Sequence, residues 1–211
     1  MAGEDDGRRA AAVFDALGSG YEKAFAHSEA HHRSLEWLLG RLAPGSTVLD
    51  VGSGTGRPTA ATLVASGHEV LGVDVSPVMV ALAERQVPGA RFRCADVRDL
   101  PLEEGSFDAV CVYFSLLQMD RADQSGLLGR LARALRPGGS LVLATVPLDL
   151  EGVDAVFMGQ PVRVTSFAGA DLVEVVRAAG LTVLAEEDTL FTPAHPDAVP
   201  EPHLFLYCGR R

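Results

Sequence analysis

The sequence predicts an α/β fold in which one mostly parallel sheet is covered by helices on both faces. Short apolar runs typical of buried strands alternate with segments of helical periodicity between residues 28 and 146. Proline and glycine residues fall at the starts and ends of the helical segments, as expected for well-defined helix boundaries. The chain of 211 residues, 47% of them hydrophobic, is long enough for one domain with a substantial core.

The helical segments between these strands have identifiable starts and stops. Ser28 is suited to cap the first of them, which ends near Pro44. Pro58 fits the first turn of the second helix, and Ser76 is suited to cap the third. These criteria predict helices at residues 28–45, 57–67, 76–89 and 123–139, and strands at residues 47–51, 69–75, 90–97, 106–114 and 140–146.

The last third of the chain departs from strict alternation. Its pattern predicts a hairpin at residues 152–166 that turns near Gly159, followed by a helix at 169–180. Two final strands are predicted at 181–191 and 203–211. The sequence contains no internal repeat or low-complexity linker, so residues 1–211 are expected to form a single domain.

Composition and charge narrow the possible functions. The formal net charge of −10 disfavours nucleic-acid or anionic-membrane partners, because phosphate binding depends on Lys and Arg. The acidic start of the chain lacks a secretory signal and no apolar run is long enough to span a membrane, so a cytoplasmic location is expected. Cys94, Cys111 and Cys208 each fall within an apolar run, which indicates buried, reduced thiols rather than a disulfide framework.

The stretch VLDVGSGTG at residues 48–56, with the strand that follows it, carries the clearest functional signal. Gly52 and Gly54 follow a predicted strand, where the absence of a Cβ atom lets the backbone turn tightly and approach a ligand. Asp74 closes the next strand, which suits a carboxylate that binds the two hydroxyls of a ribose. This pattern is typical both of nicotinamide-dinucleotide sites and of sites for S-adenosylmethionine.

Three details favour S-adenosylmethionine over a dinucleotide. The dinucleotide fingerprint requires glycine at its sixth position, where this sequence has Arg57. Asp50 would repel a pyrophosphate but attract the ammonium group of a methionine moiety. Asp96 ends the third predicted strand, where it can accept a hydrogen bond from an adenine amine. The alternatives in which Asp50 or Asp74 only caps the following turn or helix remain open.

These motifs resemble those of the class I S-adenosylmethionine-dependent methyltransferases of the small-molecule type. VLDVGSGTG resembles the first motif of that family, VLGVDVS the second, and ARFRCADVRDLPLEEGSFDAV the third and fourth. The resemblance implies a Rossmann-like three-layer sandwich with a seven-stranded, mostly parallel sheet of order 3-2-1-4-5-7-6, in which strand seven is antiparallel. It further implies N-terminal lid helices in residues 1–44, a cofactor-binding core at 47–146, and a position for the 152–166 hairpin over the acceptor pocket.

The resemblance implies a site for S-adenosyl-L-methionine, with S-adenosyl-L-homocysteine as the product. The residues that it assigns to the cofactor are Tyr21, Phe25, Asp50, Gly52, Ser53, Gly54, Asp74, Val75, Ser76, Met79, Asp96, Val97, Phe114 and Ser115. Tyr21 is equally suited to packing within the lid. No metal is expected: His27 and His31 have the spacing of metal ligands on a helix, but without a third ligand a solvated face or a helix start is favoured.

The segments that leave the strand ends are expected to bind the acceptor. Gln118 follows the fourth strand, and Phe157 and Met158 stand at the tip of the hairpin, where they either contact the acceptor or brace the hairpin. His195, in the loop before the last strand, is the candidate general base, because imidazole accepts a proton near neutral pH. A solvated loop histidine is the alternative interpretation of His195.

The expected function is methyl transfer from S-adenosylmethionine to a small-molecule acceptor, through an oxygen, nitrogen or carbon atom. A methyltransferase-like module that binds S-adenosylmethionine without methylating is the alternative, and a nicotinamide-dependent oxidoreductase is less favoured. The sequence leaves the identity of the acceptor and the oligomeric state open.

Overall fold

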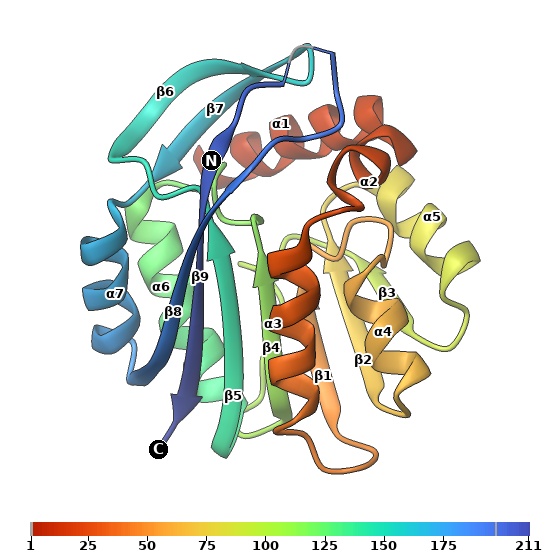
Figure 1. Ribbon diagram of the computed structural model, residues 1–211, viewed down its shortest axis with the longest axis vertical. Helices are drawn as coiled ribbons and strands as arrows, with labels where there is room; N and C mark the ends of the chain where they lie inside the picture. Colours follow the sequence, from red (N-terminus) through yellow and green to blue (C-terminus); the bar gives the residue numbers. More distant parts are fainter. Residues whose placement is uncertain (1, 197) are drawn as a thin grey trace.

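A computed structural model describes residues 2–196 and 198–211 of the chain. A seven-stranded sheet of order β3-β2-β1-β4-β5-β9-β8 forms its centre, and β6 and β7 form a separate two-stranded sheet (Figure 1). The strands are β1 (Thr47–Val51), β2 (Glu69–Asp74), β3 (Arg91–Cys94), β4 (Phe107–Tyr113), β5 (Leu135–Thr145), β6 (Leu150–Phe157), β7 (Gln160–Ser166), β8 (Leu181–Phe191) and β9 (Glu201–Arg210).

The first five strands are parallel, whereas β9 runs antiparallel to its two neighbours, β5 and β8. The predicted sixth and seventh strands are β8 and β9, because the hairpin precedes them in the chain and lies outside the main sheet. Parallel neighbours need crossover connections, and the helices between β1, β2, β3 and between β4 and β5 supply them. The α/β fold class predicted from the sequence is confirmed.

Helices cover both faces of the sheet. They are α1 (Ala2–Leu17), α2 (Ser19–Phe25), α3 (Glu29–Leu39), α4 (Thr59–Ala65), α5 (Pro77–Gln86), α6 (Arg121–Ala134) and α7 (Gly169–Ala178). Apolar residues of α3 and α4 share one core cluster, and those of α6 and α7 share the other (Figure 1). Side chains alternate along each strand, so Val48 joins the α3 side and Leu49 the α6 side.

Several predicted boundaries are observed, and others are wrong: α3 ends at Leu39 and not near Pro44, and β3 ends at Cys94, before Asp96. Ser28 caps α3 and Ser76 caps α5, each by accepting a hydrogen bond from the backbone N–H three residues ahead. The helix predicted at 123–139 instead occupies Arg121–Ala134, because Leu135 already pairs with Phe107 as the start of β5. The glycines that were expected to end the helix therefore lie within the strand.

Two structural units lie across the carboxyl ends of the parallel strands. The β6–β7 hairpin and α1 lie above these ends in Figure 1, and α1 contacts both β7 and α5. The hairpin turns at Met158 and Gly159, both with positive φ, as predicted around Gly159. Of the segment expected to form the lid, only α1 and α2 lie across this edge. Helix α3 packs on the sheet, where Leu35 and Leu38 are buried.

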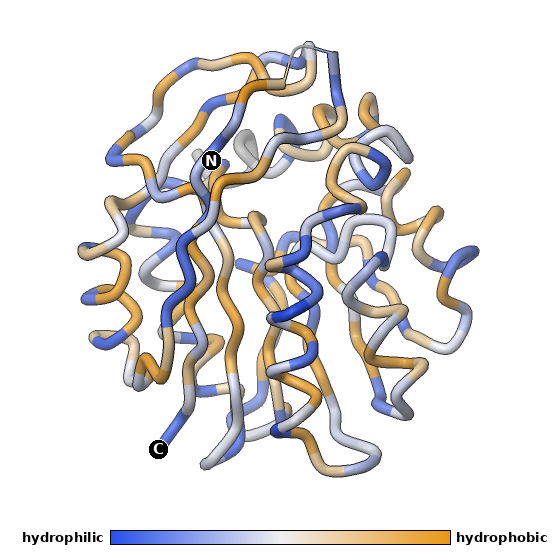
Figure 2. Tube along the Cα trace, in the orientation of Figure 1, coloured by the Kyte–Doolittle hydropathy of each residue, from blue (hydrophilic) through white to orange (hydrophobic). Residues whose placement is uncertain are grey.

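The hydropathy pattern follows this arrangement. In Figure 2 the strands of the central sheet are largely hydrophobic, and hydrophilic residues recur on the outer helices. Cys111 and Cys208 are buried as expected, but the prediction for Cys94 is wrong: β3 is an edge strand and Cys94 is exposed. None of the helices in the described part of the chain is long and apolar enough to cross a membrane.

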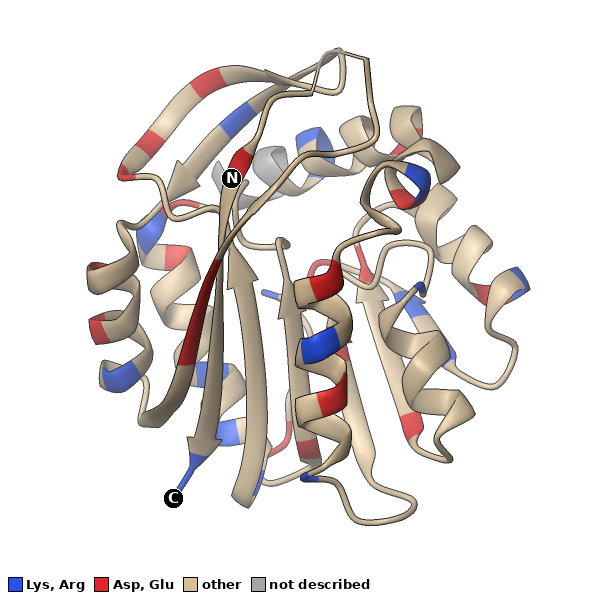
Figure 3. Cartoon of the chain, in the orientation of Figure 1, with Lys and Arg blue, Asp and Glu red and all other residues tan. Residues whose placement is uncertain are grey.

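Acidic residues gather on the outer edge strand. Glu186, Glu187 and Asp188 lie together on β8 (Figure 3). Glu187 accepts hydrogen bonds from Arg33 of α3 at 2.6 Å and from the Tyr207 hydroxyl of β9 at 2.7 Å. These bonds tie α3 to the two strands that complete the sheet.

Candidate functional site

Two adjoining cavities open at the carboxyl ends of β1, β2 and β4. The larger has a volume of about 360 Å³ and extends under α1, α2 and the hairpin. The smaller, of about 330 Å³, lies between α2, α3 and the start of α4. The residues that line both are Tyr21, Phe25, Gly52, Gly54, Tyr113 and Phe114. The two cavities therefore meet at the glycine turn after β1, where the sequence predicts a ligand.

Gly52 and Gly54 hold the glycine turn in a backbone conformation that other residues rarely adopt. Gly52 has φ +67°, and a Cβ atom there would lie 2.2 Å from Cβ of Ser115. Gly54 has φ +51°, and a Cβ atom there would meet no atom within 4 Å. Since Gly54 lines both cavities, this open space is available to a ligand that approaches the backbone.

Asp74 links the end of β2 to the glycine turn. Its carboxylate accepts hydrogen bonds from the backbone N–H of Gly54 at 2.8 Å and of Ser76 at 2.9 Å. Burial raises the pKa of Asp74, and the backbone hydrogen bonds oppose that rise. Asp74 lines the larger cavity together with Val75 and Met79, the residues that the sequence assigns to the ribose and adenine.

Asp50 faces the smaller cavity from the α3 side of β1. Only 2% of Asp50 is exposed, and its Oδ2 atom is buried without a hydrogen-bond partner. Burial, followed by the nearby charge of Asp74, raises the pKa of Asp50 to about 7. The Oγ atom of Ser53, also lining this cavity, is likewise buried and unpartnered. A cation with several N–H donors would satisfy these groups.

Asp96 and Val97 line the larger cavity beyond Asp74. The Arg98 guanidinium donates to both carboxylate oxygens of Asp96, at 3.0 Å and 2.7 Å, and also contacts Asp123 at 2.5 Å. Partial burial of Asp96 acts against ionisation, but the hydrogen bonds from Arg98 prevail and lower its pKa. Asp96 is therefore ionised and held in place by Arg98, a pairing that its sequence position did not show.

Aromatic rings from four elements close the cavities from above. Tyr21 and Phe25 of α2 stack with ring centroids 4.8 Å apart, and Phe14 of α1 meets Tyr21 edge-on at 5.6 Å. Phe157 of the hairpin lies 6.3 Å from Tyr21, and Phe191 of β8 stacks on Phe25 at 5.5 Å. Tyr21 and Phe25 thus face inward as predicted, and Phe157 lines the larger cavity.

Of the remaining predicted residues, some line the larger cavity and others do not. Phe114, Ser115 and Gln118 line the larger cavity after β4, and Phe114 has a strained φ of +54°. Ser76 is fully buried and caps α5, so its observed contacts are structural. Among the described residues that line the cavities, neither Met158 nor His195 occurs. Met158 lies in the turn of the hairpin, and His195 lies in the loop between β8 and β9.

The structure adds a histidine at the site: His31 lies at the start of α3, one of its two predicted settings. His31 is not on a solvated face: its ring lies 3.9 Å from that of Tyr113, and its Nε2 atom is 3.0 Å from Oγ1 of Thr59. Burial lowers the pKa of His31 to about 3, so the ring is neutral at physiological pH. His31 lines the smaller cavity. Its spacing after Ser28 placed it in the first turn of α3 but gave no sign of the strand packed against it.

Two further polar residues, Glu201 and His203, stand at the start of β9 beside Phe114. Glu201 lines the larger cavity, and its Oε1 atom lies 2.8 Å from Nε2 of His203. Within the described residues, no group of three or more His, Cys, Asp or Glu side chains is arranged to hold a metal ion.

Comparison with known proteins agrees with this geometry. Residues 48–139 match the family model described as a methyltransferase domain. An uncharacterised methyltransferase of Synechocystis is 32% identical over 160 residues, which cover 73% of this chain and 74% of that protein. A demethylmenaquinone methyltransferase of Clavibacter sepedonicus is 34% identical over 156 residues, which cover 68% of this chain and 62% of that protein.

Solved structures show the same fold. The Burkholderia thailandensis 1,6-didemethyltoxoflavin-N1-methyltransferase superimposes with a TM-score of 0.73 at 24% identity, over 96% of this chain and 88% of that one. The chain spans 41–62% of the length of the first three curated relatives that it matches. The sequence match, the strand order and the acid–glycine–acid site lead to one assignment: the chain belongs to the class I S-adenosylmethionine-dependent methyltransferases.

Proposed function

We propose that this protein transfers a methyl group from S-adenosylmethionine to a small, largely apolar acceptor molecule. The observation that carries the proposal is the buried, unpartnered Oδ2 atom of Asp50 beside the open Gly54 turn, with Asp74 on the far side of that turn. An ammonium group at Asp50 and a ribose at Asp74 match the two ends of this arrangement.

Each part of the cofactor has residues suited to it. The methionine end fits the smaller cavity, where Asp50 and Ser53 offer oxygen acceptors. The adenine fits the apolar space beside Met79 and Val97 in the larger cavity, and the carboxylate of Asp96 marks its polar edge. The sulfonium of S-adenosylmethionine supplies a methyl group that is already activated for transfer.

The protein's own contribution is to align the acceptor and exclude water. Tyr21, Phe25 and Phe157 cover the junction of the two cavities, where the activated methyl is expected. Fixing two reactants in line in this way can lower a barrier by roughly 7–11 kcal/mol. Apolar side chains dominate the rest of the wall: Leu117, Met119, Val146, Leu148, Val162 and Val164.

The same features support the proposed partners and location. The larger cavity is mostly apolar and lies beneath the rings of Tyr21, Phe25 and Phe157, which favours a small molecule over a polymer as the acceptor. The net charge of −10 disfavours a nucleic-acid acceptor. Cys111 and Cys208 are buried free thiols, which supports a reducing, cytoplasmic compartment.

Calorimetry with S-adenosylmethionine, S-adenosylhomocysteine and NADH tests cofactor choice. We expect binding of the first two only, and Asp74→Ala should weaken it roughly 10- to 150-fold, since hydrogen bonds to a charged group contribute about 1.5–3 kcal/mol. Asp171→Ala, in the first turn of α7, is the matched control. Tighter binding of NADH than of S-adenosylmethionine would refute the proposal.

Release of S-adenosylhomocysteine in the presence of a library of small apolar acceptors tests methyl transfer itself. A protein that binds the cofactor but releases no product with any acceptor has the non-methylating role instead.

A further inference from the structure

We infer that Glu201, held in place by His203, accepts the proton of the acceptor's hydroxyl group, and that the acceptor is a neutral aromatic or similarly flat apolar molecule carrying such a hydroxyl. This inference rests on the proposed function. It differs from the expectation for His195, which does not occur among the described residues lining the cavities.

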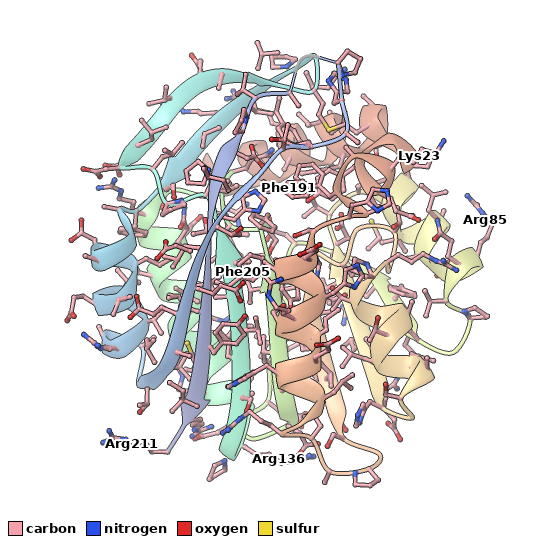
Figure 4. All side chains as sticks on the ribbon, in the orientation of Figure 1. Lys23, Arg85, Arg136, Phe191, Phe205 and Arg211 are labelled. Atoms are coloured by element: carbon pink, nitrogen blue, oxygen red, sulfur yellow. The ribbon has the colours of Figure 1, made fainter. Side chains whose placement is uncertain are left out.

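The strand geometry brings Glu201 and His203 together. They are two residues apart at the start of β9, so their side chains lie on the same face of the sheet, together with Phe205. Because β9 is antiparallel to β5, its first residues reach the edge where the parallel strands end. Figure 4 shows Phe191 above Phe205 toward this edge, and Phe191 pairs directly with Glu201.

His203 is fixed on several sides. Its side chain is fully buried, its ring stacks on Phe191 at 5.3 Å, and it lies 4.4 Å from the ring of Phe114. Its Nδ1 atom is buried without a hydrogen-bond partner. A neutral ring with its proton on Nε2 leaves only a lone pair at Nδ1, whereas a charged ring would bury an unsatisfied N–H. We therefore assign the Nε2–H tautomer, which donates to Oε1 of Glu201.

Glu201 is the partially exposed member of the pair. Its side chain is 24% exposed and lines the larger cavity, while Oε1 is occupied by His203. Glu201 pairs across the two strands with Phe191, whose ring stacks on that of Phe25 at 5.5 Å. Phe25 lines both cavities, so Glu201 lies toward their junction, and its Oε2 atom is the oxygen that is not bonded to His203.

The residues that line the larger cavity favour one chemical class of acceptor. A carboxylate within an apolar wall disfavours an anionic molecule and favours a neutral one that donates a hydrogen bond. The rings of Tyr21, Phe25 and Phe157 offer flat faces to an aromatic acceptor.

In the proposed step, a proton moves to Glu201 while the methyl group moves to the acceptor oxygen. The acceptor hydroxyl gives its proton to Oε2 of Glu201, and its oxygen forms a bond to the methyl carbon. The bond between that carbon and the sulfur breaks, and its electron pair neutralises the sulfonium. Glu201, now a carboxylic acid, returns its proton to water after the products leave. His203 does not exchange a proton; it positions the carboxylate.

The fluorescence of 2-naphthol tests this placement directly. In its excited state this molecule is a strong acid that also gives its proton to bulk water, so the probe is kept fully bound by excess protein; inside the cavity it emits as the naphtholate when a proton acceptor touches its hydroxyl. We expect naphtholate emission from 2-naphthol bound to the free protein and to its S-adenosylhomocysteine complex. Glu201→Gln should abolish that emission, and Asp188→Asn, an exposed carboxylate on the neighbouring strand, should retain it.

Two histidine variants test the positioning role. His203→Gln keeps an N–H donor and should retain most of the naphtholate emission, whereas His203→Leu should lose most of it. Thermal unfolding and calorimetry with S-adenosylhomocysteine check that each variant is folded.

The inference is wrong if bound 2-naphthol emits only as the neutral form, if 2-naphthol does not bind, or if Glu201→Gln leaves the emission unchanged. The naphthol signal needs no cofactor, so failure of the wild-type protein to bind S-adenosylmethionine would count against the proposed function alone.

Discussion

Replacing Asp50 by Asn should stabilise the free protein while weakening its affinity for S-adenosylmethionine. Asp50 is buried with an unpartnered oxygen, and burial raises its pKa from 3.8 to about 7. In the unfolded chain the group ionises near its ordinary pKa, so folding becomes less favourable as the pH rises between these two values. At roughly 1.4 kcal/mol per pH unit, the cost above about pH 7 is about 4 kcal/mol.

Because ionisation of Asp50 destabilises the wild-type protein as the pH rises, the stabilities of the two proteins are compared across a range of pH. Urea unfolding of the wild-type protein and Asp50→Asn should give equal free energies well below pH 3.8, where the carboxyl is protonated in both states. As the pH rises, the variant should become more stable than the wild-type protein. The difference in the free energy of unfolding should become constant above about pH 7, at up to about 4 kcal/mol.

Asp108→Asn is a control of opposite sign. Asp108 accepts from the Thr47 backbone N–H at 2.8 Å and pairs with Arg136 at 2.5 Å. Although burial acts the other way, these contacts lower the pKa of Asp108, so its removal should destabilise the protein above the ordinary pKa of an aspartate.

Cofactor binding gives the second half of the test. Asp50→Asn should bind S-adenosylmethionine roughly 10- to 150-fold more weakly, because a charge-assisted hydrogen bond contributes about 1.5–3 kcal/mol. Below about pH 7, binding to the wild-type protein should release a proton, measured by calorimetry in buffers of different ionisation enthalpy. Unchanged stability at every pH, together with unchanged affinity, would refute the assignment of Asp50 as a buried, uncompensated carboxylate.

Two further predictions concern the cover of the cavities. Hydrogen exchange in residues 14–25 should slow when S-adenosylhomocysteine is added, because Gly18, with φ +48° between α1 and α2, allows these helices to move as a lid; equal exchange in both states would contradict this. Phe157→Ala should change acceptor affinity or choice and leave cofactor affinity nearly intact, since this ring contacts Tyr21 and Phe25 in pairs that contribute about 0.5–1.5 kcal/mol each. Val153→Ser, on the same strand at a side chain that is 41% exposed and absent from the cavity lining, is the matched control, and parallel loss of stability and cofactor binding in Phe157→Ala would favour a bracing role.

The features of this protein that depend on short-range pattern could be predicted from the sequence. Periodicity and capping residues identified the crossover helices and parallel strands, and the spacing from Asp50 through the glycines to Asp74 located the ligand edge. These signals are local, since a helix cap needs three residues and a strand-end turn needs five or six. They were enough to infer the family and the cofactor half of the site.

Which side chains meet across the site could not be predicted, because those contacts form between residues far apart in the sequence. Arg98 neutralises Asp96, and His31 lies against Tyr113, through contacts that packing creates. The pairing of Glu201 with His203 follows strand alternation and was in principle legible. Its place at the cavity was not legible, because that depends on β9 inserting antiparallel between β5 and β8. A sequence records the order of residues along the chain, whereas a site depends on which strand ends share an edge of the sheet.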